Sequence, residues 1–408
     1  MKDAKQHLSD LAILGGEPLF AEMLHVGRPN IGNRERLFER MNDILDRRWL
    51  TNNGPMVQEL EQRLAEFLGV KHVITMTNAT LGLEIAIRAL GMSGEVIVPS
   101  FTFIATAHAL QWQEITPVFC DIDPRTHTID PGRIEQLITP HTTGIIGVHL
   151  WGRACDIDAL TDIARQHDLK LLFDAAHAFG STWHGQRIGN FGDAEVFSFH
   201  ATKFFNTFEG GAVTTNDDEL AGKIRLMKNF GFAGMDNVVY IGTNGKMSEA
   251  SAAMGLTSLE SIDDFIETNI RNYHSYQRGL ADIPGITMMS YDEDEQNNYQ
   301  YIVLEVDEEA AGISRDQLMW LLHAENVRAR RYFYPGCHRM EPYRSYYPNA
   351  GLLLPETEKL AERVLSLPTG TAVNEEDIQA ITRFIQFVVK HSLEIAAIIE
   401  HREDNTKT

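Results

Sequence analysis

The segment from residue 142 to residue 174 alternates strand-like and helix-like patterns, and this alternation constrains the fold more than any other feature. A buried apolar run, TTGIIGVHL, is followed by the amphipathic pattern DIDALTDIARQH and by a second apolar run, LKLLFD. Two strands that are joined through a helix run parallel, and a parallel sheet needs helices on its faces. The chain is therefore predicted to contain an α/β domain with a mostly parallel central sheet.

The same alternation continues on both sides of this unit, so the sheet is expected to have further strands. Amphipathic helices are predicted at residues 57–68 and 80–90, where apolar residues recur at three- and four-residue spacing. Short strand-like runs stand between and after these helices. They are HVITMTN, GEVIVPS, EVFSFH and GAVTTND.

The last third of the chain has a different order of elements. From about Ala250 the pattern predicts one long helix through SLESIDDFIETNIRNYHSYQRGL, then a strand at YQYIVLEVD and helices at SRDQLMWLLHAENV and EEDIQAITRFIQFVVKHSL. With 408 residues the chain is long enough for two or three domains. We therefore expect a large α/β domain over residues 1–255 and a smaller α+β domain over residues 256–408.

Acidic residues outnumber basic ones and give the chain a formal net charge of −21. A surface of this sign repels phosphate backbones and anionic lipids within a Debye length. Nucleic acids and membrane surfaces are therefore not expected as partners. A small phosphorylated ligand is still compatible with this charge, because a pocket of backbone amides and a few basic side chains binds an anion locally.

Three cysteines, Cys120, Cys155 and Cys337, are scattered through the chain. Their odd number and wide spacing predict neither a disulfide framework nor a zinc site, and they favour a reducing compartment. The N-terminal apolar patch is interrupted by Gly15-Gly16, unlike a signal peptide, and no run is long enough to span a bilayer. We expect a cytoplasmic protein without a metal ion.

Three polar positions follow predicted strands at the place where a parallel sheet binds ligands, outside the carboxyl ends of its strands. Asp174 ends LKLLFD, Lys203 lies three residues after EVFSFH, and Asn78-Ala79-Thr80 separates a strand from a helix. A desolvated lysine there can form a Schiff base, a buried carboxylate can hold a cation, and the turn can bind a phosphate. Taken one at a time, a helix cap, a solvated lysine and an ordinary N-cap are the simpler interpretations.

Four further side chains flank these positions. Phe103 follows the strand at GEVIVPS and could stack on a planar ring, although a single Phe is most often part of a core. Ser198 and His200 share one face of the strand EVFSFH, which leads to Lys203, and ordinary sheet chemistry also explains them. His177 follows the end of LKLLFD by three residues and could bond a ligand oxygen, or it could be structural.

The conjunction of these positions is more informative than any one of them. A phosphate-binding turn, an aromatic ring, an acid and a lysine each follow a different strand of one predicted sheet, and convergence on one crevice is typical of a cofactor site. These are the groups that pyridoxal phosphate needs: a lysine for the imine, a carboxylate for the pyridine nitrogen, and amides for the phosphate. The sequence therefore predicts pyridoxal 5′-phosphate as the cofactor.

The chain also resembles the sugar aminotransferases of the DegT/DnrJ/EryC1/StrS family, from about Arg28 to Pro368. The resemblance implies fold type I of the pyridoxal-phosphate enzymes, with a large domain around the central sheet and a smaller C-terminal domain. Together the matching segments are highly specific. They are WLTNNGPMVQELEQRLAEFLG, TNATLGLEIAI, VPSFTFIATAHA, FDAAHAFGS, FSFHATKFFNTFEGGAV, GTNGKMSEASAAMGL and RRYFYPGCHRMEPY.

The resemblance assigns roles to residues by position. Lys203 would form the Schiff base with the cofactor, Asp174 would pair with its pyridine nitrogen, and Phe103 would stack on its ring. The residues that would hold its phosphate are Ala79, Thr80 and Ser198.

Two further positions follow from the same resemblance. Asn244, in GTNGKMSE, matches an asparagine that reaches the phosphate from the neighbouring subunit, which implies a homodimer with shared active sites. His177 stands where many relatives have Gln, near the phenolic oxygen of the cofactor. The chain departs from the family pattern at that position.

Two segments, FHATKFFNTFEGG and GTNGKMSEA, resemble the corresponding segments of the enzymes that aminate carbon 4 of a nucleotide-linked 4-keto-6-deoxyhexose. The implied reaction moves the amino group of L-glutamate to dTDP-4-keto-6-deoxy-D-glucose. It gives 2-oxoglutarate and dTDP-4-amino-4,6-dideoxy-D-glucose, a building block for surface polysaccharide or a glycosylated metabolite. The basic side chains expected to meet the sugar nucleotide are Arg28, Lys246, Arg330, Arg331 and His338.

Three other functions remain open from the sequence. Amination at carbon 3 uses the same fold and cofactor. A pyridoxal-phosphate-binding regulator without turnover would need a partner surface, and no DNA-binding motif or basic stripe supports one. Elimination or dehydration is the third, but relatives that dehydrate replace the lysine by histidine, so Lys203 favours transamination.

Overall fold

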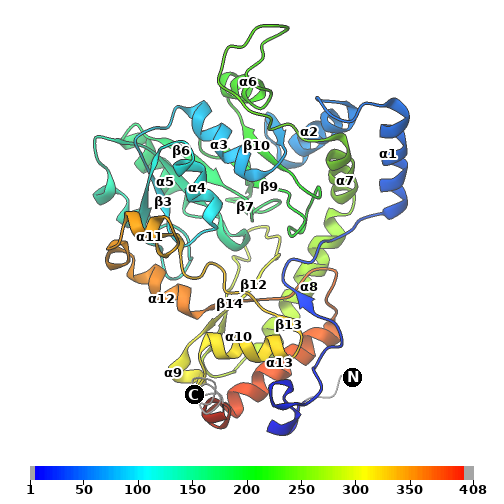
Figure 1. Ribbon diagram of the computed structural model, residues 1–408, viewed down its shortest axis with the longest axis vertical. Coiled ribbons are helices and arrows are strands. Elements are labelled where there is room, and N and C mark those ends of the chain that lie inside the picture. The colour runs from blue at the N-terminus through cyan, green and yellow to red at the C-terminus, as the bar shows by residue number, and fades with distance from the viewer. Residues whose placement is uncertain (1–4, 399–408) are drawn as a thin grey trace.

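The computed structural model describes residues 5–398, which form a large part around a seven-stranded sheet and a smaller part below it in the view of Figure 1. The large sheet has the strand order β2-β10-β9-β6-β5-β3-β4. Its strands are β2 (His72–Met76), β10 (Gly211–Thr215), β9 (Ala194–Ser198), β6 (Lys170–Asp174), β5 (Thr142–Val148), β3 (Glu95–Pro99) and β4 (Thr116–Cys120).

Only β10 runs against its neighbours in this sheet. It is antiparallel to β2 and to β9, whereas the pairs from β9 through β6, β5 and β3 to β4 are all parallel. The prediction of an α/β fold with a mostly parallel sheet is confirmed. The strand–helix–strand unit that suggested it is β5, α5 (Ile157–Gln166) and β6.

Helices cover both faces of the large sheet, because its strands are apolar on both sides. In β3, Val96 and Val98 pack in one core and Ile97 packs in another. The first core includes α3 (Ala79–Leu90), α4 (Ile104–Gln111) and α6 (Asp218–Met227), and the second includes α2 (Pro55–Leu68), α5 and α7 (Glu249–Leu259), with α1 (Arg34–Arg47) beyond it.

The smaller part is an antiparallel sheet covered by helices. Its strands are β11 (Ile286–Met288), β12 (Ile302–Val306) and β14 (Val364–Leu367), in that order. Its helices are α8 (Ile262–Leu280), α9 (Glu308–Ala311), α10 (Arg315–Ala324), α12 (Pro355–Arg363) and α13 (Glu375–Lys390). The short helix α11 (Tyr343–Tyr346) comes from the same C-terminal stretch, but its Tyr343 is buried in the core that contains α3 and α4 of the large part.

The N-terminal segment belongs to the core of the smaller part. Leu11, Leu19 and Phe20 are buried in the same cluster as the residues of β12 and β14. The short strand β1 (Leu24–His25) pairs in parallel with β13 (Val327–Arg328). The expected domain division at residues 255 and 256 stays a prediction, and residues 11–24 pack with the C-terminal side of it.

The single long helix predicted from about Ala250 is wrong, because the chain forms two helices, α7 and α8, with a break at Ser261. This residue has φ −112° and ψ 12°, outside the helical region. The preceding Glu260 accepts hydrogen bonds from Arg40 and Arg63, both at 3.0 Å. The break thus lies next to the contact of Glu260 with two arginines. The spacing of apolar residues in the sequence does not predict such a contact.

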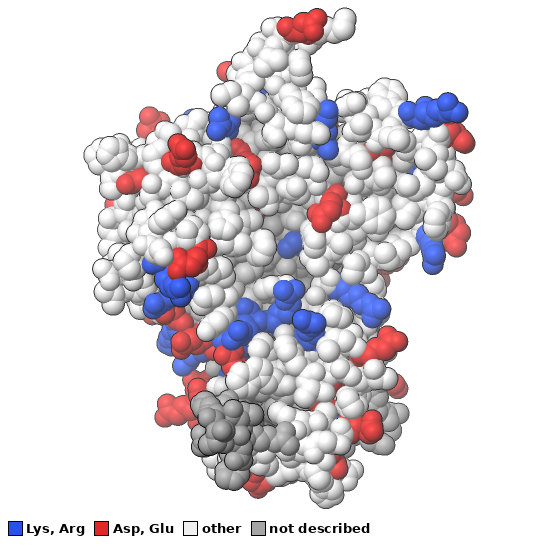
Figure 2. All heavy atoms as spheres, viewed as in Figure 1, with Lys and Arg blue, Asp and Glu red and all other residues white. Residues whose placement is uncertain are grey.

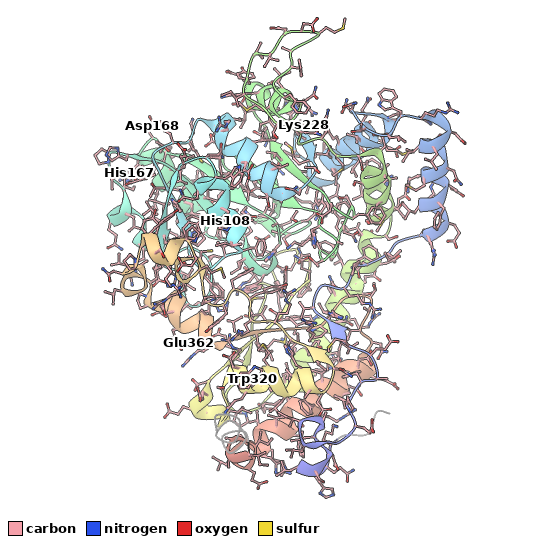
Figure 3. The ribbon with its side chains drawn as sticks, viewed as in Figure 1. His108, His167, Asp168, Lys228, Trp320 and Glu362 are labelled. Carbon is pink, nitrogen blue, oxygen red and sulfur yellow. The ribbon has the colours of Figure 1, made fainter. Side chains whose placement is uncertain are left out.

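The two parts contact each other through α4 and α11 as well as along α8. His108 of α4 and the hydroxyl of Tyr343 lie 2.9 Å apart, and Figure 3 shows His108 on the helix next to this contact. Asp121, just after β4, accepts hydrogen bonds from the N–H groups that begin α12. Among residues 5–398, no helix has both the length and the apolar character that crossing a bilayer requires.

Candidate active site

One edge of the large sheet carries the candidate side chains. There β3 leads to Phe103, β6 ends at Asp174 and β9 ends at Ser198. The opposed strand β10 begins at the same edge with Gly211, which pairs with Ser198 on one side and with Met76 on the other. Residues from distant parts of the sequence therefore meet at the edge where a parallel sheet binds ligands.

Asp174 is held in a buried position, with 6% of its surface exposed. Its Oδ2 accepts a hydrogen bond from the hydroxyl of Thr106 at 2.8 Å, and its Oδ1 accepts one from the N–H of Ala176 at 3.1 Å. Burial raises the pKa of Asp174, and the two hydrogen bonds and the charge of Lys203 oppose that rise. The carboxylate is therefore fixed in direction and favoured as a partner for a cationic N–H group.

Lys203 lies half-buried in the loop after β9, where its Nζ donates a hydrogen bond to the hydroxyl of Tyr301 at 3.2 Å. Burial lowers the pKa of Lys203 to about 8, and the attraction of Asp174 opposes this shift. Much of the amine is consequently neutral at mildly alkaline pH, and the neutral amine is the form that attacks a carbonyl carbon. A freely solvated lysine does not fit these surroundings.

The turn before α3 forms a cradle of backbone N–H groups. Asn78 caps this helix by accepting from the N–H of Leu81 at 2.9 Å, and the N–H groups of Ala79 and Thr80 have no partner within residues 5–398. A Cβ on Gly211 would lie 2.8 Å from the nitrogen of Ala79, so only glycine lets β10 start this close to the helix. The cradle points its positive end at the site.

Phe103 and His177 both lie near the ring of Phe333. Phe103 is not part of the core, since 56% of its surface is exposed and its ring centroid lies 6.3 Å from that of Phe333. Burial lowers the pKa of His177 well below its usual value, so the ring is neutral. Its Nδ1 accepts a hydrogen bond from the N–H of Trp151 at 3.3 Å, which assigns the proton to Nε2.

This set of groups fits pyridoxal phosphate. A directed carboxylate, an amine with a lowered pKa and an exposed flat ring follow strands at one edge of the sheet, and free N–H groups stand at a helix N-terminus there. Ser198, opposite Gly211, adds a hydroxyl beside that terminus. His200 is turned to Thr202, with Nδ1 and Oγ1 2.8 Å apart, so the structure does not bring it to the same group of side chains.

The five basic residues expected at the substrate are distributed over four places. Arg330 and Arg331 line a cleft next to Phe103. Lys246 lines a separate cavity and donates to Asn52 at 2.7 Å, and His338 is buried between Ser100 and Glu358, which occupy both ring nitrogens.

Arg28, the fifth basic residue, and Asn244, which was expected at the cofactor phosphate, both have exposed side chains. Arg28 lies between Gly27, whose Cα approaches Thr202, and Asn30, whose Nδ2 donates to the carbonyl of Phe204 at 3.1 Å. It is thus beside the loop that carries Lys203. Asn244 faces outward and its side chain has no hydrogen bond among residues 5–398.

The cleft beside Phe103 is called the arginine cleft below. It has a volume of about 580 Å³. Figure 2 shows Lys and Arg atoms gathered across the middle of this face, between the two parts of the molecule, with Asp and Glu scattered around them. The residues that line the cleft are His25, Val26, Thr102, Phe103, Ile104, Met319, His323, Arg328, Ala329, Arg330, Arg331, Tyr332, Phe333, Tyr334 and Met340.

Sequence reasoning missed several of the side chains that complete the site. Thr106, which holds Asp174, follows Thr102 by one helical turn, and that spacing could have indicated it. Tyr301 lies directly before β12 in the smaller part, and nothing in its local pattern predicts contact with Lys203. The same holds for His25 and Arg328, which only the pairing of β1 with β13 brings together.

The sequence model of the DegT/DnrJ/EryC1/StrS aminotransferase family matches residues 32–386. The chain is 40% identical over 365 residues to the dTDP-4-amino-4,6-dideoxy-D-glucose transaminase of Shigella dysenteriae, covering 89% of this chain and 98% of that one. Both similarities extend through the large sheet and the smaller part.

Two solved structures are similar over nearly the whole fold. The structure of DesI in the presence of its TDP-sugar product has a TM-score of 0.93 and 50% identity, and the match covers 97% of this chain and all of that one (100%). The pyridoxal-phosphate form of the putative sugar aminotransferase Spr1654 from Streptococcus pneumoniae has a TM-score of 0.82 and 25% identity, over 91% of this chain and 99% of that one.

Proposed function

The chain belongs to the DegT/DnrJ/EryC1/StrS aminotransferase family, and we propose from this premise that it aminates carbon 4 of dTDP-4-keto-6-deoxy-D-glucose with L-glutamate as donor. The products are dTDP-4-amino-4,6-dideoxy-D-glucose and 2-oxoglutarate. The observation that carries this proposal is the 40% identity, over 98% of its length, to a transaminase named for that amino sugar. The convergence of Asp174 and Lys203 on one sheet edge supports it independently.

The protein is a sugar aminotransferase and its cofactor is pyridoxal phosphate. When bound, the cofactor serves as an electron sink for the carbon that loses its proton. We propose that Asp174 pairs with the pyridine nitrogen, that Lys203 bonds covalently to the aldehyde carbon, and that Phe103 stacks on the ring. The N–H groups of Ala79 and Thr80 would hold the phosphate.

Two other side chains are proposed to contact the cofactor. Ser198 stands opposite Gly211 at the edge of the cradle and can donate its hydroxyl proton to the phosphate. His177 is neutral and carries its proton on Nε2, so it can donate a hydrogen bond to the phenolic oxygen. A donor at that oxygen is what the commoner glutamine would also supply.

Lys203 has a second role once an amino donor has displaced it. Its freed Nζ would accept the proton from the α-carbon of glutamate and hold it for return, and with the ketosugar it would move a proton in the reverse sense. The pKa of about 8 suits an amine that must both accept and release a proton. The hydroxyl of Tyr301, 3.2 Å away, keeps the Nζ near the reacting atoms.

We propose that the active site is shared in a homodimer. The loop between α6 and α7 projects from the large sheet (Figure 1), and Asn244 near its end is exposed. Apolar side chains along this loop are also exposed, which favours their burial by a second copy of the chain. They are Phe230, Phe232, Met235, Val238, Val239, Tyr240 and Ile241.

Mixing two inactive variants tests the shared site. In a hybrid of Lys203→Ala and Asn244→Ala subunits, one site carries both changes and the other carries neither. Recovery of activity on mixing supports sharing, and its absence while hybrids form contradicts it. We also propose a cytoplasmic location, because Cys120, Cys155 and Cys337 are free and buried.

The function itself is tested in two steps. Adding L-glutamate to the yellow holoenzyme is expected to bleach the visible absorbance of the cofactor and release 2-oxoglutarate, and Lys203→Ala is the inactive control. An unchanged spectrum with every amino donor would favour the regulator. Adding dTDP-4-keto-6-deoxy-D-glucose is then expected to restore the absorbance, whereas ammonia or a dehydrated sugar would indicate elimination.

A further inference from the structure

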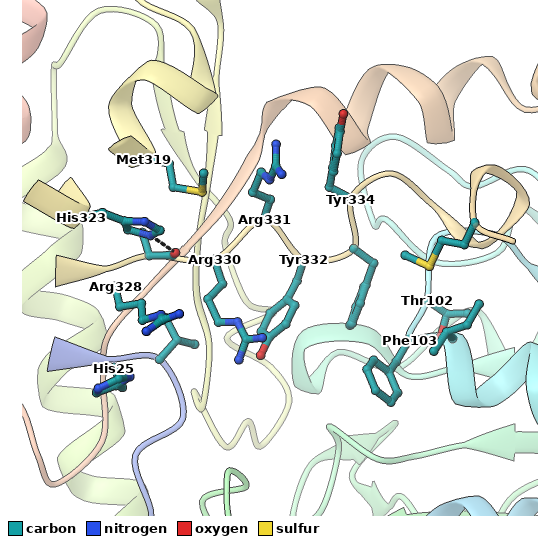
Figure 4. A pocket seen from close by; sticks show the side chains of 15 residues that line it. His25, Thr102, Phe103, Met319, His323, Arg328, Arg330, Arg331, Tyr332 and Tyr334 are labelled. Carbon is teal, nitrogen blue, oxygen red and sulfur yellow. Dashed lines mark hydrogen bonds between the residues drawn. The ribbon is translucent and has the colours of Figure 1, made fainter. Parts of the chain in front are cut away.

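The arginine cleft is basic along its length, although the chain as a whole carries a net charge of −21. Figure 4 shows His25 and Arg328 at one end, Phe103 at the other, and Arg330 and Tyr332 between them. None of the described residues that line the cleft is Asp or Glu. Its potential is therefore positive, against the field of the rest of the surface.

The arginines of the cleft differ in how they are neutralised. Arg331 is paired, since its Nη1 donates to both carboxylate oxygens of Asp316 at 3.1 Å. Arg330 stacks on the ring of Tyr332 at 4.8 Å and has no carboxylate partner within residues 5–398. The side chain of Arg328 is exposed and has no hydrogen bond or ion pair in the described part of the chain. Two adjacent cations are thus left without a counter-charge.

The strand pairing explains why these cations face the same way. Leu24 pairs with Val327, and both are buried; His25 pairs with Arg328, and both are exposed. Successive residues of a strand point to opposite faces, so Arg330, two positions after Arg328, returns to the exposed face. The burial pattern alternates without exception from Val327 to Arg330.

The N-terminal segment that supplies His25 is anchored by a buried acid. Glu325 is 1% exposed, and its two oxygens accept from the N–H groups of Ala12 at 2.8 Å and Leu19 at 2.7 Å. It also pairs with the Nζ of Lys5 at 3.0 Å. A further bond, from the N–H of Leu24 to the carbonyl of Asn326 at 2.8 Å, leads directly into β1. His25 is thus held beside Arg328 by the fold itself.

We propose that His25, Arg328 and Arg330 form the subsite for the diphosphate of a nucleoside diphosphate. This assignment rests on the proposed function, because it supplies the place where the nucleotide of the sugar substrate binds. Guanidinium groups match phosphate oxygens in geometry, and two unpaired arginines beside an imidazole match the two phosphates of such a ligand. The segment at β1, with His25 and Val26, then forms one wall of the substrate site.

The position of the cleft fits the length of the substrate. Its inner end is formed by Phe103 and Phe333, next to the proposed cofactor ring. Tyr332 lies beside Tyr301, with ring centroids 6.5 Å apart, and Tyr301 contacts Lys203. A sugar over Lys203 would therefore have its diphosphate directed outward along Arg330 toward Arg328 and His25.

The proposal is tested by measuring the affinity of the holoenzyme for dTDP. Loss of a charged hydrogen bond at an exposed site is expected to weaken dTDP binding by about tenfold or more in Arg328→Gln, with a smaller loss in His25→Asn. The rate of the glutamate half-reaction should not change in either variant. Arg165→Gln, an exposed arginine of α5 paired with Asp162, is the matched control.

Two further measurements separate the possible outcomes. Inorganic pyrophosphate should compete with dTDP in the unchanged enzyme and thymidine should not, which distinguishes diphosphate from base recognition. Equal dTDP affinity in Arg328→Gln and in the unchanged enzyme overturns the subsite. If the enzyme binds dTDP through Arg328 but does not aminate the ketosugar, the subsite stands and the proposed function fails.

Discussion

The Lys203 pocket and the arginine cleft lie next to each other but differ in how their charged groups are surrounded. The pocket is formed by Asp174, Lys203, Thr106 and Tyr301. In the pocket each ionisable group is buried or half-buried and has a partner, and burial has shifted the pKa of both Asp174 and Lys203. In the cleft the cations of Arg328 and Arg330 are exposed and have no counter-charge within residues 5–398. The difference separates two tasks: the pocket is arranged to change protonation, and the cleft is arranged to hold an anion.

The largest effect should come from the lysine of the pocket. Lys203→Ala removes both the covalent attachment of the cofactor and the proton carrier, so turnover is expected to fall by about 10⁴-fold or more. Single-turnover kinetics with L-glutamate measure this. Lys170→Ala, an exposed lysine at the start of β6, is the control, and comparable loss in that variant would contradict the assignment.

Asp174→Ala should lower the chemical rate by about 10²- to 10³-fold, because the developing negative charge loses the cation that Asp174 maintains. The Michaelis constant for the sugar nucleotide should be nearly unchanged. Near-normal turnover of this variant would disprove the proposed role.

The stability of the apoenzyme gives an independent test of Asp174. Burial raises the pKa of Asp174 in the folded state above its value in the unfolded state. The folded protein therefore loses stability as the pH rises from the unfolded pKa to the folded pKa, and the whole loss is present at any higher pH. Asp174→Asn should therefore leave the apoenzyme at least as stable as the parent at neutral pH, and only the holoenzyme should lose stability. Thermal unfolding of both forms measures this, and a clearly destabilised apo variant would contradict it.

A cleft variant should show the opposite kinetic pattern. Arg330→Gln is expected to raise the Michaelis constant for the sugar nucleotide by about tenfold, through loss of one charged contact, while the glutamate half-reaction keeps its rate. Steady-state kinetics with each substrate varied in turn measure the two effects separately. A fall in the rate of the glutamate half-reaction alone would show that Arg330 acts in the chemistry and not in binding the sugar nucleotide.

The smallest effect is expected at His177. Since the neutral ring donates from Nε2, His177→Gln keeps a donor at the phenolic oxygen and should change the rate by only about threefold or less. His177→Phe, which lacks the donor, should cost more. Equal rates for the two variants would show that the hydrogen bond does not contribute.

The sequence predicts the pocket better than the cleft, for a physical reason. Asp174 and Lys203 follow strands of one alternating unit, and the carboxyl ends of parallel strands must share an edge, so local pattern is enough to place them. The outer end of the arginine cleft is formed by β1 and β13. Each of these strands is only two residues long, and they lie some three hundred positions apart in the chain. No local periodicity reports such a pairing.

In the fold, too, the elements that depend on local pattern are predicted and those that depend on distant contacts are not. The strands and helices of the α/β unit match their predicted segments because both faces of the sheet are apolar. The edge strand β4 was missed, since Pro117 lowers the strand signal and is tolerated only because β4 has one neighbour. The break between α7 and α8 was missed because it depends on Glu260 and its two arginine partners from α1 and α2.

The most direct test of the central claim follows the amino nitrogen from donor to sugar. Isotopically labelled L-glutamate and dTDP-4-keto-6-deoxy-D-glucose are incubated with the holoenzyme, and the product is analysed by nuclear magnetic resonance. The account predicts that the label is bonded to carbon 4 of the sugar, and that Lys203→Ala gives no labelled product. Label at carbon 3, or unlabelled sugar alongside an active glutamate half-reaction, would contradict it.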